Sequence, residues 1–232
     1  RNLKAPTGMD TRPTTDRVKE SFISSLISAY GSLEGAHVLD AFAGSGALGI
    51  ECLSRGAESA VFFERDKAAL EALRSNIDVL KLSQERARVR QADVLATPPV
   101  YGAPFDIVIL DPPYAYPTEE VWAFVQTLRE RGMLAPDAVI TYEHHSKVDV
   151  AGFIEQTGES VEIHANKIFG KSKVGFVLFS FQEDAEPAGI TQWKGMRFPY
   201  KEDYREKSVG SGYIRPYYQW AHRRHCPRIS DV

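Results

Sequence analysis

The chain has 232 residues, of which 43% are hydrophobic and 25% are charged, and its formal net charge is −3. This length allows one or two domains, and the composition excludes a wholly disordered chain. The sequence contains no apolar run of the roughly 18 residues that a transmembrane helix needs, and no secretory signal opens it. Cys52 and Cys226 are too few for a disulfide framework and lack the spacing of a zinc site, so we expect a cytoplasmic protein without a metal.

Positive charge is concentrated at the two ends of the chain. Residues 1–19 carry five basic and two acidic groups, and residues 185–232 carry nine basic and five acidic groups. The rest of the chain is acidic. This distribution is compatible with a local site for a polyanion.

Three regions follow from the pattern along the chain. Residues 1–13 are polar, contain two prolines and are expected to be extended. Residues 14–183 are expected to form one domain. Residues 184–232 form a basic and aromatic extension that we expect to be disordered or loosely packed on the body. Because the chain starts at Arg1 rather than Met, we also expect sequence before it.

Hydrophobic periodicity predicts alternating helices and strands. A helix is predicted from the cap region at Thr14, Thr15 and Asp16 to Gly31. Further helices are predicted from the glycine loop to about residue 55, over 67–81 and over 118–131. The predicted strands cover residues 37–42, 60–64, 88–92, 105–110, 138–142, 161–168 and 174–181. This order predicts an α/β, Rossmann-like fold with a mostly parallel sheet and an antiparallel terminal hairpin.

A glycine loop follows the first predicted strand and opens a helix. It contains Gly44, Gly46 and Gly49 in a G-x-G-x-x-G pattern, which alone also fits a dinucleotide or a turn without a ligand. Asp40 lies at the mouth of this site, where a carboxylate would repel a pyrophosphate but suits an ammonium and a sulfonium group. The run from Asp40 through Phe42 to the glycines therefore indicates S-adenosylmethionine (AdoMet).

Acidic residues end four successive predicted strands. They are Asp40, Glu64, Asp93 and Asp111. Ligands of open α/β sheets bind at these carboxyl ends. We expect Glu64 to hold the ribose hydroxyls and Asp93 to accept a hydrogen bond from the adenine amino group.

The loop Asp111-Pro112-Pro113-Tyr114 is the most informative tetrapeptide of the chain. Two prolines fix its backbone and remove two N–H donors, so the loop presents acceptors. Asp111 and the Pro112 carbonyl could accept both protons of an exocyclic amine and direct its lone pair toward a sulfonium methyl. Tyr114 would stack on the base. No general base is required, so His144 and His145 are interpreted as strand-end residues.

With these motifs the chain resembles the RsmD family of AdoMet-dependent enzymes, which methylate N2 of a guanine in 16S ribosomal RNA. The matching stretches are residues 3–6, 11–20, 38–51, 53–57 and 111–114. The resemblance implies AdoMet at Gly44, Gly46, Glu64 and Asp93. It also implies a seven-stranded sheet, and the target guanine at the Asp111 loop.

Basic residues near the expected active site are candidates for contact with RNA phosphates, and those of the N-terminal segment are also candidates for contact with the carboxylate of AdoMet. They are Arg12, Arg17, Lys19 and Lys171, with Lys167 and Lys173 close to the last of these. The expected partner is 16S rRNA or the small ribosomal subunit, and a monomer is expected. The basic strand that the family has before Leu3 is represented by at most Arg1, and the extension 184–232 is foreign to the family.

Two other functions fit parts of the pattern. The Asp-Pro-Pro-Tyr loop also serves enzymes that methylate adenine N6 or cytosine N4 in DNA or RNA. A non-catalytic RNA-binding module would keep the fold, but it predicts degraded cofactor loops, and both loops are intact.

Overall fold

A computed structural model describes residues 16–170 and 173–182 of the chain. All of them belong to one structural unit that ends at Glu183. The expected segment 1–13, Arg12, Lys171 and the extension 184–232 lie outside the described residues, so the proposed domain limits stay a prediction.

Helices and strands alternate along the described chain, as the periodicity predicts. The helices are α1 Asp16–Tyr30, α2 Ala47–Ser54, α3 Lys67–Leu80, α4 Thr118–Glu130 and α5 Val150–Gln156. The strands are β1 His37–Asp40, β2 Ser59–Glu64, β3 Ala87–Gln91, β4 Phe105–Leu110, β5 Leu134–His145, β6 Val161–Phe169 and β7 Val174–Phe181. No described helix has the length and apolar character needed to cross a bilayer.

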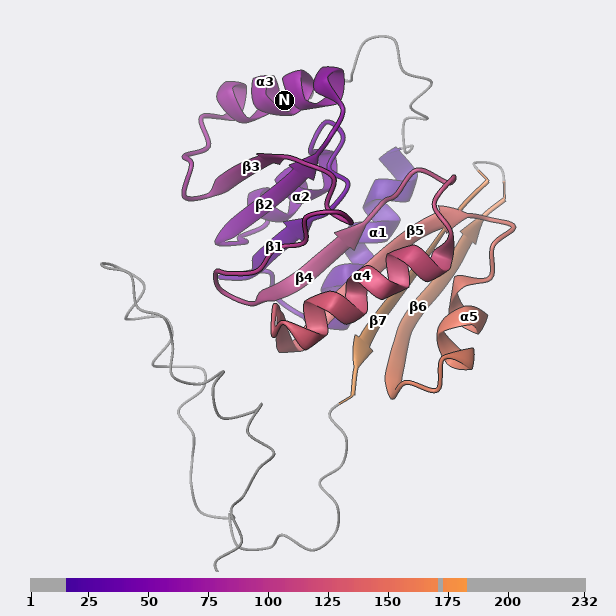
Figure 1. Ribbon diagram of the computed structural model, residues 1–232. Helices are drawn as coiled ribbons and strands as arrows, with labels where there is room; N and C mark the ends of the chain where they lie inside the picture. The colour runs from indigo at the N-terminus through magenta and orange to yellow at the C-terminus, as the bar shows by residue number, and fades with distance from the viewer. Residues whose placement is uncertain (1–15, 171–172, 183–232) are drawn as a thin grey trace, which may run out of the picture. The chain divides into compact units, whose positions relative to one another are not determined.

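The seven strands form a single sheet in the order β3-β2-β1-β4-β5-β7-β6 (Figure 1). Strands β1 to β5 pair in parallel, and β7 is antiparallel to both of its neighbours. The predicted fold class is therefore confirmed. The chain moves outward from β1 in one direction and then returns to β4 on its other side. This reversal makes the carboxyl end of β1 and β4 the place where open α/β sheets bind ligands.

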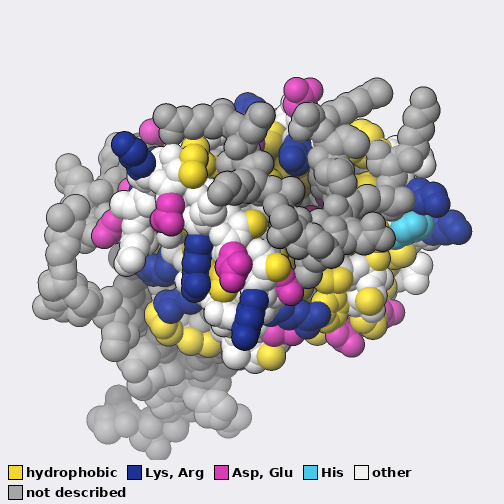
Figure 2. All heavy atoms as spheres, turned by 90° about the horizontal axis from the view of Figure 1, so that it is seen from above, with side chains coloured by type: hydrophobic (Ala, Val, Ile, Leu, Met, Phe, Trp, Pro, Cys, Tyr) yellow, Lys and Arg dark blue, Asp and Glu magenta, His cyan; other side chains and the backbone are white. Residues whose placement is uncertain are grey.

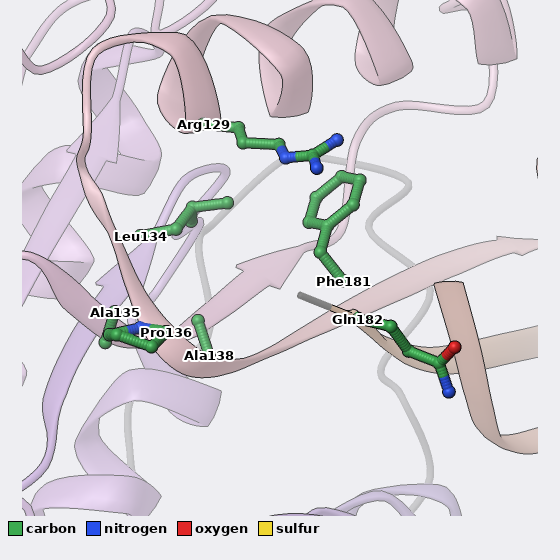
Figure 3. A pocket seen from close by; sticks show the side chains of 7 residues that line it. All are labelled: Arg129, Leu134, Ala135, Pro136, Ala138, Phe181 and Gln182. Carbon is green, nitrogen blue, oxygen red and sulfur yellow. The ribbon is translucent and has the colours of Figure 1, made fainter. Parts of the chain in front are cut away.

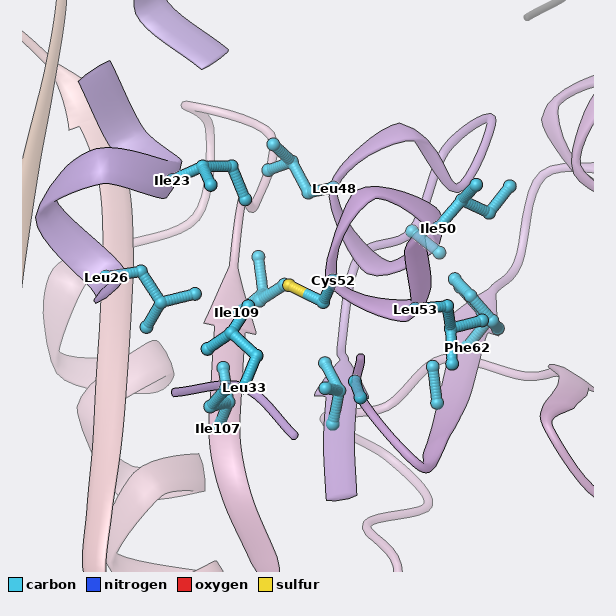
Figure 4. Packing of buried hydrophobic residues seen from close by; sticks show 14 of the residues in the cluster. Ile23, Leu26, Leu33, Leu48, Ile50, Cys52, Leu53, Phe62, Ile107 and Ile109 are labelled. Carbon is cyan, nitrogen blue, oxygen red and sulfur yellow. The ribbon is translucent and has the colours of Figure 1, made fainter. Parts of the chain in front are cut away.

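Two hydrophobic clusters cover the two faces of the sheet. Helices α1, α2 and α3 supply one cluster, and α4 and α5 supply the other. Figure 4 shows Ile23 and Leu26 of α1 and Cys52 of α2 converging on Ile109 of β4. Alternate residues of each strand enter alternate clusters, because successive side chains point to opposite faces.

Aromatic contacts fix α1 on the sheet. Phe22 of α1 meets the ring of Phe176 of β7 edge-on, with ring centroids 5.8 Å apart, and Phe169 of β6 packs on the same ring at 5.8 Å. Phe176 is completely buried. These contacts fix the position of the helix that follows the N-terminal segment.

Two elements differ from the sequence prediction. Helix α5 was not predicted, because it has only seven residues and contains Gly152; the Asp149 side chain caps it by accepting a hydrogen bond from the Gly152 N–H at 3.0 Å. Strand β5 begins at Leu134, four residues before the predicted start at residue 138. Phe105 of β4 pairs with Leu134 and Ile107 pairs with Val139, and this register shift leaves Pro136 and its neighbours outside the regular pairing.

Replacing Phe176 with Ala should destabilise the protein by about 3–5 kcal/mol, because a fully buried ring leaves a cavity. Urea unfolding followed by circular dichroism measures this loss. Val100→Ala is the control, because Val100 is 58% exposed and its truncation should change the free energy of unfolding by less than about 0.5 kcal/mol. A loss below about 1 kcal/mol for Phe176→Ala would contradict the packing of α1 on β7.

Candidate functional site

Four acidic side chains lie at the carboxyl ends of four adjacent strands and form what we term the acid row. In the order of the strands β2, β1, β4 and β5, they are Glu64, Asp40, Asp111 and Glu143. Alternate side chains of each strand face α1, α2 and α3, and the four acidic residues occupy the next of these alternate positions. Their side chains therefore lie on the same face of the sheet. Their charges interact from neighbour to neighbour: Asp40 with Glu64 and Asp111, and Asp111 with Glu143.

The glycine loop passes over this row and is bonded to it. Gly46 has a φ of +79° and its N–H donates to the Ala43 carbonyl at 2.7 Å, so the chain turns sharply into α2. A Cβ at Gly49 would lie 2.9 Å from the Asp40 carboxylate. Glycine there lets the Gly49 N–H donate to Asp40 Oδ2 at 3.0 Å.

Glu64 holds the loop from the other side. Its Oε2 accepts the N–H of Gly44 at 2.8 Å, and its Oε1 accepts the N–H of Asp66 at 2.7 Å. The two bonds fix the carboxylate plane, and each oxygen keeps a lone pair for a ligand hydroxyl. The structure thus gives Glu64 a backbone partner that the sequence did not predict, and leaves it able to hold a ribose.

Asp93 lies two residues beyond the end of β3, in a cluster with an arginine and two aromatic rings. Arg65 donates to Asp93 Oδ2 at 2.9 Å, and the Leu95 N–H donates to Oδ1 at 3.0 Å. Arg65 also lies over the ring of Tyr116 at 5.4 Å, and Tyr116 contacts Phe42 at 6.0 Å. Burial raises the pKa of Asp93, but the bonds from Leu95 and Arg65 outweigh it, so the pKa falls below its usual value.

The loop after β4 presents one carboxylate and one exposed ring. Asp111 is partly exposed, Pro112 is buried, and Tyr114 is 44% exposed. The Tyr116 N–H donates to the Pro113 carbonyl at 3.0 Å and closes the turn. The carboxylate and the ring therefore share one short, rigid segment.

Three members of the acid row, Asp40, Asp111 and Glu143, resist ionisation. Burial, followed by repulsion from Asp111 and Glu64, raises the pKa of Asp40 to about 7 despite the bond from Gly49. Burial also raises the pKa of Asp111 to about 6, and burial with repulsion from Asp111 raises the pKa of Glu143 to about 8. Among the described residues, the ion pairs leave all four carboxyl groups without a basic partner. A cationic ligand would relieve this strain.

The structure brings most of the predicted site residues together at one edge. The glycine loop, Asp40, Glu64 and Asp111 form one group, and Phe42 joins Asp93 through Tyr116. Arg17 and Lys19 lie in the first turns of α1, where only Lys19 has a described side chain. The ammonium of Lys167 instead binds Ser25 of α1 at 2.8 Å.

Sequence reasoning interpreted Glu143 as a strand-end residue before a site residue, and it did not single out Arg65. Glu143 directly follows Tyr142, which pairs with Leu110, so it stands beside Asp111. That signal requires the register of two strands, and periodicity alone does not provide it. Arg65 was not predicted because its role depends on a contact 28 residues away in sequence.

A shallow pocket lies at the opposite end of the sheet (Figure 3). It is bordered by Arg129 of α4, Leu134 at the start of β5 and Phe181 at the end of β7. The Arg129 guanidinium is already paired with Glu159 at 2.6 Å and lies over Phe181 at 4.3 Å. This pocket offers none of the chemistry of the acid row.

Comparisons with known proteins point to one family. The family model described as conserved hypothetical protein 95 matches residues 1–178. Ribosomal RNA small subunit methyltransferase D of Escherichia coli is 33% identical over 186 residues, which cover 80% of this chain and 87% of that protein. Bacillus subtilis YlbH, provisionally named an rRNA methyltransferase, is 40% identical over 153 residues, covering 65% of this chain and 80% of that protein.

A solved structure has the same fold. The Escherichia coli protein yhhF, provisionally named a methyltransferase, superposes with a TM-score of 0.63 and 33% identity. The match covers 79% of this chain and 93% of that one.

Asp40→Asn should stabilise the protein more at pH 8 than at pH 5. The pKa of Asp40 is about 7 when folded and about 3.9 when unfolded, so raising the pH through this range favours the unfolded chain. Asparagine keeps an acceptor for Gly49 and carries no proton to lose. We expect the stability difference between variant and wild type, from urea unfolding, to rise by about 1–3 kcal/mol from pH 5 to pH 8. A difference independent of pH would contradict the raised pKa.

Proposed function

This chain belongs to the conserved hypothetical protein 95, or RsmD, family of ribosomal RNA methyltransferases, and on that premise we propose that it methylates the exocyclic N2 of a guanine in 16S rRNA, with AdoMet as donor. The observation that carries the proposal is the acid row beside the Asp111 loop. It combines a place for a cation with an acceptor for an amine on one edge of the sheet.

The cofactor site fits AdoMet by the chemistry of its groups. The glycine loop leaves room for the chain to approach a ligand, and Glu64 has free lone pairs for the ribose hydroxyls. Asp93 and the rings of Phe42 and Tyr116 would receive the adenine. Asp40, which is buried without a basic partner among the described residues, would face the cationic part. Bound there, AdoMet supplies an electrophilic methyl group.

Asp111 orients the target amine. A nucleobase amine is a poor nucleophile, because its lone pair is delocalised into the ring. Asp111 and the Pro112 carbonyl accept its two protons and favour a pyramidal nitrogen. Positioning of this kind is worth roughly 7–11 kcal/mol in well-oriented reactions. Tyr114 supplies the exposed ring on which the base stacks.

The nucleic-acid partner is inferred from the family and from the charge of the chain. The acidic body argues against broad duplex binding, because nonspecific affinity comes from neutralised phosphates. Figure 2 shows Lys and Arg side chains interspersed with Asp and Glu on the visible described surface. We infer a local contact with structured RNA in the cytoplasm, by a monomer, with Arg12, Arg17, Lys19 and Lys171 as candidate phosphate ligands.

The test is methyl transfer from labelled AdoMet to 16S rRNA, purified small subunits and duplex DNA. The RNA and subunits come from cells that lack this enzyme. We expect N2-methylguanosine in one of the two RNA substrates. Methylated adenine or cytosine would keep the reaction class and overturn the base assignment, and binding of AdoMet without any product would overturn the proposal.

Asp111→Ala should retain AdoMet binding and lose most of the transfer in this assay, by at least about 100-fold. The cofactor groups stay in place, while the amine loses its acceptor. Asp137→Ala is the control, since Asp137 is exposed at the start of β5. Unchanged turnover of Asp111→Ala would contradict the role of the loop.

AdoMet should bind more tightly relative to S-adenosylhomocysteine as the pH rises from 6 to 8.5. The two ligands share the amino group, and only AdoMet carries the sulfonium charge. The attraction of this charge to the site strengthens most when Asp40 ionises near pH 7. Calorimetry should show the affinity ratio rising by about tenfold, the equivalent of one pKa unit. In Asp40→Asn the ratio should change less with pH. A constant ratio in the wild type would contradict a cation site at the acid row.

A further inference from the structure

The exposed ring of Tyr114 needs support if it is to serve as a platform. Its segment follows two prolines, so the backbone is rigid, but a side chain that is 44% exposed can adopt several rotamers. A base can stack productively on only one of them. The contacts of the ring therefore decide whether the platform exists before RNA arrives.

Two residues of β5 hold the ring from two directions. The Tyr114 hydroxyl makes a hydrogen bond with the Glu143 carboxyl group. The Tyr114 ring also meets the His145 ring edge-on, with centroids 5.5 Å apart and an interplanar angle of 84°. Glu143 and His145 are two positions apart in a strand, so their side chains leave the same face.

Both residues are themselves fixed. Glu143 is 6% exposed, and β5 is paired on both sides, with Glu143 opposite Phe176 of β7. His145 Nδ1 accepts the N–H of Lys147 at 3.2 Å, which fixes the ring at the turn after the strand. The strand end thus offers a rigid frame.

We propose that Glu143 and His145 are positioning residues that hold the Tyr114 ring in the orientation that receives the target base. The inference rests on the proposed function and deepens it, because it assigns residues outside the Asp-Pro-Pro-Tyr loop to substrate binding. Glu143 acts on the phenol, and His145 acts on the ring. Neither residue needs to touch the RNA.

The electrostatics of the pair Asp111 and Glu143 support this division. Glu143 is buried on β5, and Asp111 is partly exposed in the loop after β4; burial raises the pKa of Glu143 to about 8 and that of Asp111 to about 6. A substrate amine can reach Asp111, while Glu143 lies within the sheet and bonds to Tyr114.

The test is a double-mutant cycle with single-turnover methyl transfer to the RNA substrate. Tyr114→Phe removes only the hydroxyl, and Glu143→Leu removes its partner. Each should slow transfer by about 10- to 100-fold, and the double variant should be no slower than the slower single variant. Glu143→Gln should restore most of the rate, because its amide oxygen accepts the phenol proton.

A matched control separates positioning from damage to the strand. Thr141 lies two residues earlier on the same face of β5, is fully buried, and donates its hydroxyl to the Val108 carbonyl at 3.4 Å. Thr141→Val should lower the melting temperature and leave the single-turnover rate unchanged. A loss of rate in this control equal to that of Glu143→Leu would overturn the proposal.

His145 provides a second cycle that does not depend on a buried substitution. His145→Ala should raise the KM for RNA several-fold, and His145→Phe should retain the wild-type KM because it keeps an edge-on ring. Neither substitution should change the KM in a Tyr114→Ala background. Multiplicative effects in either cycle, or no rescue by Glu143→Gln in a folded protein, would overturn the inference. Absence of transfer by the wild type would instead overturn the proposed function.

Discussion

Four carboxyl groups lie at the ends of four adjacent strands on one face of the sheet, and the cost of placing them side by side shapes this end of the molecule. Loss of water favours the neutral forms of Asp40, Asp111 and Glu143, and repulsion from neighbouring carboxyl groups adds to this for Asp40 and Glu143. Three of the four carboxyl groups are held by hydrogen bonds, from two kinds of donor. Asp40 and Glu64 bind backbone N–H groups of the glycine loop and helix starts, while Glu143 binds a phenol. The remaining imbalance is what a cationic ligand would relieve.

The rest of the fold supplies the rigidity that this arrangement needs. Cores on both faces of the sheet, reaching from α1 and α2 on one side to α4 and α5 on the other, keep the strand ends in register. The stability lost at the carboxyl edge is offset by burial elsewhere, as is usual at functional sites. Rearrangement of the row would require moving strands that are paired on both sides, so its geometry is set before any ligand binds.

The sequence was sufficient for the fold and for those site residues that follow a strand directly. The sequence predicted Asp40, Glu64 and Asp111 because each ends or directly follows an apolar run that is typical of a buried strand, and parallel strands end at one edge of the sheet. Glu143 was not, because its neighbour Asp111 is 32 positions away and only the β4–β5 register brings them together. The pairing of Arg65 with Asp93, and the short helix α5, likewise depend on tertiary contacts that no local pattern encodes.

The pair Asp111 and Glu143 illustrates how similar groups can acquire different duties. Both are carboxyl groups, so intrinsic acidity hardly distinguishes them. Their surroundings do: Glu143 is the more deeply buried of the two residues and lies within the sheet. Asp111 sits in a loop, where solvent or a substrate amine can reach it. A loop residue that solvent can reach is suited to meet the substrate, and a buried strand residue is suited to hold the loop. The chemistry at this edge therefore depends on the difference between the two sites rather than on either acid alone.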